Sequence, residues 1–170
     1  IMLLFGTLLA ISTAMMIRLL QKKSFYLQTL DYANMILAKE NAEKHKLNEQ
    51  LRKLSRSAEQ SPSSIIITDL AGRIEYVNPK FTQLSGFAPE EVIGKNPRFL
   101  KSGKTSASEY ENLWETITSG GDWHGEFQNR KKNGDCYWGL AAISPIRNAS
   151  GEITHFISSM EDITERKLAE

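Results

Sequence analysis

The sequence has little cysteine and histidine. Cys136 is the one cysteine in 170 residues, so no disulfide can form within the chain, and this usage is typical of a reducing compartment. The three histidines, His45, His124 and His155, lack the spacing of metal ligands, which predicts that no metal is bound. No phosphate-binding loop, nucleophile with a base, kinase phosphoacceptor box or cyclase signature occurs either. We therefore expect no catalytic residues and no enzyme within this chain.

Charged residues are absent from the first 17 residues, which read IMLLFGTLLAISTAMMI. As a helix rising about 1.5 Å per residue, this run would span about 26 Å, slightly less than the ~30 Å hydrocarbon core of a bilayer. Arg18, Lys22 and Lys23 follow it, which predicts a transmembrane helix over residues 1–20 with its C-terminal end in the cytoplasm. Because the chain begins with Ile, we expect this helix to be truncated at its start. A buried core helix is the alternative.

Glycine and proline are absent from residues 18–60, where helix-forming residues dominate. The composition predicts a helical connector over residues 21–60. Two blocks of apolar residues at alternating spacings of four and three predict a parallel homodimeric coiled coil, and the register passes through Glu40 and Lys44, which would weaken its centre. The alternative is a single amphipathic helix on a membrane or domain surface. The apolar positions are Tyr26, Leu30, Ala33, Leu37, Leu47, Leu51, Leu54 and Ala58.

The connector is also the basic part of the chain. Nine positive and five negative side chains lie in residues 18–61, a balance that would favour anionic lipid. No basic patch interleaved with aromatic residues is present, so we expect no nucleic-acid partner.

Residues 61–164 have the length and mixed patterning of one globular domain. Runs of β-branched or alternating residues predict strands at 65–67, 73–77, 123–131, 136–146 and 153–160. Asn78, Pro89 and the capping box Ser106-x-x-Glu109 mark the starts of three helices. Asn133-Gly134 predicts a type I′ hairpin turn. The element order predicts an α+β fold, in which helices pack on one face of a five-stranded antiparallel sheet.

The globular segment resembles a PAS domain, and specifically the sensory modules of bacterial membrane signalling receptors. The resemblance covers about residues 61–167, and it implies the spatial strand order 2-1-5-4-3 around a ligand cavity. It is carried by IIITDLAGRIEYVNPKFTQLSGF, PEEVIGKNPRFLKSG, LWETITSGGDWHGEFQNRKKNGDCYWGLAAISPI and GEITHFISSMEDITERK.

Two flavin-binding groups of PAS domains are relevant to the ligand. Residues 96–100 (NPRFL) resemble the reactive Asn-Cys-Arg-Phe-Leu motif of the light-oxygen-voltage class, but Pro97 replaces the cysteine, so adduct photochemistry is excluded. Of the three amides by which that class binds the isoalloxazine ring, Asn129 matches one, while Gly139 and Met160 stand at the other two positions.

The redox-sensing flavin group is more similar. Its Leu-Trp, Trp-x-Gly and Asn-Arg-x-x-x-Gly motifs resemble residues 113–114, 123–125 and 129–134. The resemblance implies that Trp114 lines a flavin and that Asn129 bonds its polar edge, with FAD as the cofactor. The alternative is that Trp114 is a core residue, that Asn129 ends a strand and that no cofactor is bound. Arg98, Lys101 and Lys104 would attract an anionic ligand tail, and a solvated loop is the alternative for them.

The resemblance further implies that Asp162, Ile163 and Thr164 couple the last strand to an output helix beginning at residues 165–170. Asp162-x-x-Glu165 can cap such a helix. We therefore expect a sensor in the bacterial inner membrane whose cytoplasmic PAS domain senses a small ligand or redox state and signals to a downstream histidine kinase or diguanylate cyclase. A response regulator is the expected partner of that effector. The alternative is a ligand-free PAS module that serves dimerisation and scaffolding.

Overall fold

The computed structural model describes the backbone of residues 2–169 and the side chains of residues 11–169. It comprises two compact units, Ile1–Lys53 and Leu54–Glu170. Helix α1 (Met2–Glu59) accounts for the first unit and the start of the second, which confirms the helical prediction for the connector. The apolar seam predicted for the coiled coil is exposed in this single chain, for example at Leu30, Leu51 and Leu54. Its pairing with a second chain stays a prediction.

The predicted transmembrane segment, residues 1–20, lies only partly within the described side chains, since those of residues 1–10 are outside them. Among the residues that the structure describes, no helix combines the length and the apolar character needed to cross a bilayer.

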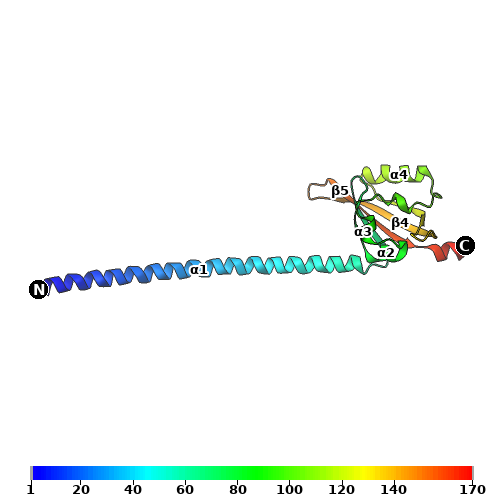
Figure 1. Ribbon diagram of the computed structural model, residues 1–170. Coiled ribbons are helices and arrows are strands. Elements are labelled where there is room, and N and C mark those ends of the chain that lie inside the picture. Colours follow the sequence, from blue (N-terminus) through cyan, green and yellow to red (C-terminus); the bar gives the residue numbers. More distant parts are fainter. Residues whose placement is uncertain (1, 170) are drawn as a thin grey trace. The chain divides into compact units, whose positions relative to one another are not determined.

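The second unit is an α+β domain, as predicted (Figure 1). Its strands lie close to their predicted positions, because alternating apolar residues are buried on one face of the sheet. Helices α2 and α4 are capped by the expected residues, Asn78 and Ser106. The elements are β1 (Ser64–Asp69), β2 (Ile74–Val77), α2 (Pro79–Ser85), α3 (Pro89–Val92), the 3₁₀ helix η1 (Pro97–Leu100), α4 (Ala107–Thr118), β3 (Trp123–Arg130), β4 (Cys136–Arg147), β5 (Ile153–Asp162) and α5 (Thr164–Ala169).

The five strands form one antiparallel sheet in the order β2-β1-β5-β4-β3, which confirms the order that the resemblance implied. The last strand, β5, lies at the centre and pairs with both β1 and β4. Residues Phe156, Ser158 and Met160 alternate along β5 and face the helices, since successive side chains of a strand point to opposite sides.

The turn predicted between β3 and β4 is of a different type. A type I′ turn with Asn133 and Gly134 at its centre requires a positive φ at both residues. Gly134 has φ +96°, but the φ of Asn133 is not positive. The Gly134 N–H donates to the carbonyl of Lys131 at 3.0 Å, and the Lys131 N–H donates to Asp135 at 2.8 Å. The hairpin prediction is therefore confirmed, and the type I′ prediction is wrong: the three-residue loop places its glycine one position later than that turn requires.

Two groups of buried apolar residues lie between the sheet and the helices. One joins α4 to β3, β4 and β5 through residues such as Leu113, Phe127 and Phe156. The other joins α2, α3 and η1 to β1 and β2 through residues such as Ile74 and Phe81. Residues of both groups line a cavity, which therefore lies within the domain between them.

Asn78 holds the start of the domain together. Its side chain is almost fully buried and makes four hydrogen bonds. The amide nitrogen donates to the carbonyls of Ala58 at 3.0 Å and Ser63 at 2.9 Å, and the amide oxygen accepts from the N–H groups of Ile65 at 2.9 Å and Phe81 at 3.0 Å. One side chain therefore ties the end of α1 to β1 and α2.

Candidate functional site

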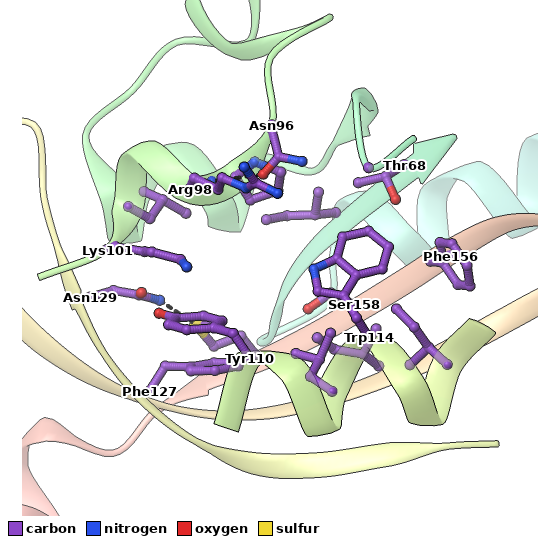
Figure 2. Close-up of a pocket in the computed structure, with 18 of the residues that line it drawn as sticks. Thr68, Asn96, Arg98, Lys101, Tyr110, Trp114, Phe127, Asn129, Phe156 and Ser158 are labelled. Atoms are coloured by element: carbon purple, nitrogen blue, oxygen red, sulfur yellow. Dashed lines mark hydrogen bonds between the residues drawn. The ribbon is translucent and has the colours of Figure 1, made fainter. Parts of the chain in front are cut away.

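The cavity has a volume of about 380 Å³, within the range of small-molecule sites. It lies between the helix-facing side of the sheet, helix α4 and the η1 segment (Figure 2). Most of its wall is apolar or aromatic, and a few polar side chains project into it. The polar and charged lining residues are Thr68, Asn96, Arg98, Lys101, Glu111, Asn129 and Ser158.

The structure brings Trp114 and Asn129 to this one cavity, although they come from helix α4 and strand β3. Trp114 packs edge-on against Phe156, with ring centroids 6.0 Å apart. It also lies against Gly72 in the β1–β2 turn, where an added Cβ would come within 2.9 Å of the indole ring. The indole therefore forms a firmly placed aromatic wall at one end of the cavity.

Asn129 lies toward the other end and is 5% exposed. Its amide nitrogen donates to the sulfur of Met160 at 3.6 Å, a weak bond because thioether sulfur is a poor acceptor. The Met160 side chain occupies the space that Gly139 leaves empty on the neighbouring strand, since a Cβ at Gly139 would overlap its sulfur and Cγ atoms. A ligand with a stronger acceptor can therefore replace Met160 as the partner of Asn129.

Two stacked rings and a lysine surround the end of the cavity at Asn129 (Figure 2). The rings of Tyr110 and Phe127 are 5.5 Å apart and nearly parallel. The ammonium of Lys101 lies 3.2 Å from the centroid of the Tyr110 ring. Burial lowers the pKa of Lys101, and the neighbouring positive charge of Arg98 lowers it further. Burial likewise raises the pKa of Tyr110.

The predicted transmission residues lie where β5 ends and α5 begins. The Asp162 carboxylate accepts from the Thr164 N–H at 2.9 Å and so caps α5. The Ile163 N–H donates to the carbonyl of Trp138 at 2.9 Å, and the Trp138 N–H donates to the Thr164 hydroxyl at 2.9 Å. These bonds hold the first turn of α5 against Trp138 on β4. Trp138 is adjacent in sequence to Gly139, and Gly139 contacts Met160, which lines the cavity.

The sequence assigned no ligand contact to Tyr110, Phe127 or Ser158, all of which line the cavity. The alternation of side chains along a strand could have indicated Phe127 and Ser158. Phe127 lies two residues from Asn129 on β3 and Ser158 two residues from Met160 on β5, so each pair faces the same side of the sheet.

Of the three basic residues considered for an anionic ligand tail, Arg98 and Lys101 line the cavity and Lys104 does not. For Lys101 the sequence left a ligand contact and a solvated loop as alternatives, since its position depends on the path of the chain after η1. Pro97 also lines the cavity, as its match to the reactive cysteine position implied.

A family model described as "PAS domain" matches residues 62–165. Among curated proteins, the bacterioopsin transcriptional activator of Halobacterium salinarum is 32% identical over 126 residues, which are 72% of this chain and 19% of that protein. The nitrogen fixation regulatory protein of Klebsiella oxytoca is 31% identical over 62% of this chain and 21% of its own length. A blue-light-activated histidine kinase of Brucella canis is 35% identical over 54% of this chain and 19% of its own length.

Two solved structures extend the comparison. An RNA-binding light-oxygen-voltage receptor matches 67% of this chain and 33% of that chain with a TM-score of 0.63 and 32% identity. The light-oxygen-voltage domain of a blue-light activated histidine kinase from Erythrobacter litoralis matches 62% of this chain and 99% of that chain with a TM-score of 0.57 and 25% identity. The chain spans about a fifth of the length of the curated relatives it matches.

Proposed function

The chain belongs to the PAS domain family, sensory modules of signalling proteins, and on this premise we propose that its cavity binds a small cytoplasmic ligand whose presence is transmitted through α5. One observation carries the proposal. Strand β5 contributes Phe156, Ser158 and Met160 to the cavity and then runs directly into Asp162 and Thr164, which hold the output helix. A ligand that moves β5 therefore acts on the hydrogen bonds at the start of α5.

Transmission would follow a contiguous set of contacts. A ligand that bonds Asn129 releases Met160, whose side chain lies against Gly139. The residue before Gly139, Trp138, holds α5 through its backbone hydrogen bonds with Ile163 and Thr164. Binding then shifts the population between docked and released arrangements of α5, in proportion to the difference in ligand affinity between them.

A flavin is the first ligand class to test, because Trp114 and Asn129 line the same cavity and an aromatic wall with a few fixed polar groups suits a flat heterocycle. Thr68 and Ser158 add polar groups on the sheet side. A bound FAD would make the module responsive to redox state. Pro97 provides no thiol, so no cysteinyl adduct is part of the proposal.

The test is the visible absorption spectrum of the purified chain, followed by thermal shift with oxidant and candidate metabolites. We expect either a flavin band or a ligand-dependent rise in melting temperature. Asn129→Ala and Trp114→Ala should reduce occupancy, whereas Asn133→Ala, an exposed change in the β3–β4 turn, should not. If the protein is colourless and neither oxidant nor any candidate metabolite changes its melting temperature, ligand sensing is contradicted and the scaffolding alternative is favoured.

We further propose the setting of this sensor: an anchor in the bacterial inner membrane, the PAS domain on the cytoplasmic side, and a histidine kinase or diguanylate cyclase as effector, with a response regulator as its partner. The apolar run at residues 1–17 and the basic residues after it support the anchor. The named histidine kinase among the relatives supports the effector class.

Parallel dimerisation through α1 is the remaining part of this setting. The exposed seam residues Leu47, Leu51 and Leu54 support it, since they repeat at coiled-coil spacing. Cysteines introduced at Leu51 and Leu54 should crosslink two chains, and strictly monomeric behaviour would contradict the dimer. We also expect no nucleic-acid partner; the RNA-binding activity named for one solved structure is a property of that receptor.

A further inference from the structure

The walls of the cavity are suited to a flat apolar body. At one end Tyr110 and Phe127 are stacked with an interplanar angle of 8°. At the other end Trp114 meets Phe156 at 89°, so the two pairs present ring faces and edges to the space between them (Figure 2). Rings in these arrangements contact aromatic ligands favourably.

Lys101 introduces a positive charge into this apolar space. Its ammonium approaches the Tyr110 ring, and among the salt bridges of the described residues none includes Lys101 or Arg98. Two other lysines of the domain are paired with acids, Lys132 with Glu91 at 2.6 Å and Lys167 with Glu126 at 2.8 Å. Burying an ammonium without an acidic partner is unfavourable, and the lowered pKa of Lys101 has the same cause.

Among the described residues, no carboxylate forms a salt bridge with Lys101. Glu111 is the acidic residue that lines the cavity, and it is exposed on α4. Arg98 adds a second positive charge, and the buried Asn129 amide offers a donor next to Lys101 (Figure 2). The cavity therefore combines an apolar interior with a positively charged end, at which Lys101 and Asn129 can donate hydrogen bonds.

We infer that the cavity is built for an organic anion, whose flat apolar body lies among the aromatic side chains and whose carboxylate or phosphate group is bound by Lys101. This rests on the proposed ligand-sensing function and adds the chemical class of the ligand. A free aromatic carboxylate and the phosphate of a flavin nucleotide share this chemistry.

The experiment uses the purified full chain and two probes of equal shape, 2-naphthoate and the neutral 2-naphthamide, with binding measured by calorimetry at low salt. A charge-assisted hydrogen bond predicts that the carboxylate binds about tenfold more tightly or better. Lys101→Met should abolish this preference and Lys101→Arg should keep it. Lys104→Met is the matched control, because Lys104 is exposed three residues away and does not line the cavity.

A flavin absorption band in the purified protein would identify the nucleotide as the source of the anion. In that case Lys101→Met should purify with less flavin than Lys104→Met. Equal binding of the two probes, a preference that persists in Lys101→Met, or flavin content unaffected by that change would overturn the inference alone. If the protein is colourless and neither probe binds, both the inferred ligand class and the proposed ligand-sensing function are contradicted.

Discussion

Replacing Asn78 by alanine should destabilise the globular unit more than the loss of an ordinary helix cap. The side chain caps α2 through the Phe81 N–H, bonds the Ile65 N–H, and donates to the carbonyls of Ala58 and Ser63. Alanine can replace none of these four bonds. Three different segments, the end of α1, β1 and α2, lose a shared partner at once.

The magnitude follows from the separate losses. Removal of a cap costs about 1 kcal/mol. Each of the three further bonds contributes about 1 kcal/mol, and the two carbonyls recover part of theirs because Ala58 and Ser63 are only half-buried and accessible to water. The sum is about 3 kcal/mol. For a domain of this size it corresponds to a melting temperature lowered by about 12 °C or more.

The assay is thermal unfolding followed by circular dichroism, with Ser106→Ala as the matched control. Ser106 caps α4 through the Glu109 N–H, but it is exposed and its loss affects one helix start. We expect the control to cost about 1 kcal/mol. If Asn78→Ala lowers the melting temperature no more than Ser106→Ala does, the reasoning that Asn78 links three segments is refuted.

Two predictions concern charge. Glu126 pairs with Arg166 at 3.1 Å and Lys167 at 2.8 Å, and the Lys167 bond is the main reason that the pKa of Glu126 is lowered. The stability from this pairing is fully present above the ordinary pKa of 4.5 and is lost as pH falls through the lowered pKa. Glu126→Gln should therefore speed hydrogen exchange in α5 at neutral pH, and the difference from the unchanged protein should be smaller in high salt. Equal exchange in the two proteins would contradict the pairing. Burial raises the pKa of Tyr137 to about 12. Because the phenol of the unfolded chain ionises near pH 10, the stability that neutral Tyr137 contributes is lost as pH rises from about 10 to about 12. In a pH titration, the phenolate absorbance step at the highest pH should vanish in Tyr137→Phe. If the step persists, it belongs to another tyrosine.

Local patterns were enough to predict the five strands and the helices α2, α3 and α4 of the globular unit, but not the 3₁₀ helix η1. The caps Asn78 and Ser106 act on N–H groups three residues away, so a short stretch of sequence contains the whole interaction. The turn at Asn133-Gly134 shows the limit of such patterns, because the same dipeptide fits more than one hairpin turn and the pairing of β3 with β4 selects among them.

The candidate site could be predicted only in part. Trp114 and Asn129 were identified through their resemblance to known motifs, and both line the cavity. For Lys101 the sequence left two interpretations, attraction of an anionic ligand tail and a solvated loop, and it could not choose between them. The proximity of Lys101 to Tyr110 arises because the chain after η1 pairs with β3, where Lys101 lies opposite Asn129.

The sequence by itself determined the strand and helix positions, the family resemblance, and the apolar and basic character of the first residues. These depend on interactions between residues near one another in the chain, or on composition. The tertiary structure alone decided that a cavity lies between the two groups of core residues, that Met160 fills the space beside Gly139, and that Lys101 lies within an apolar wall. Each requires side chains from distant segments to meet, and packing of that kind depends on the whole sheet and its helices.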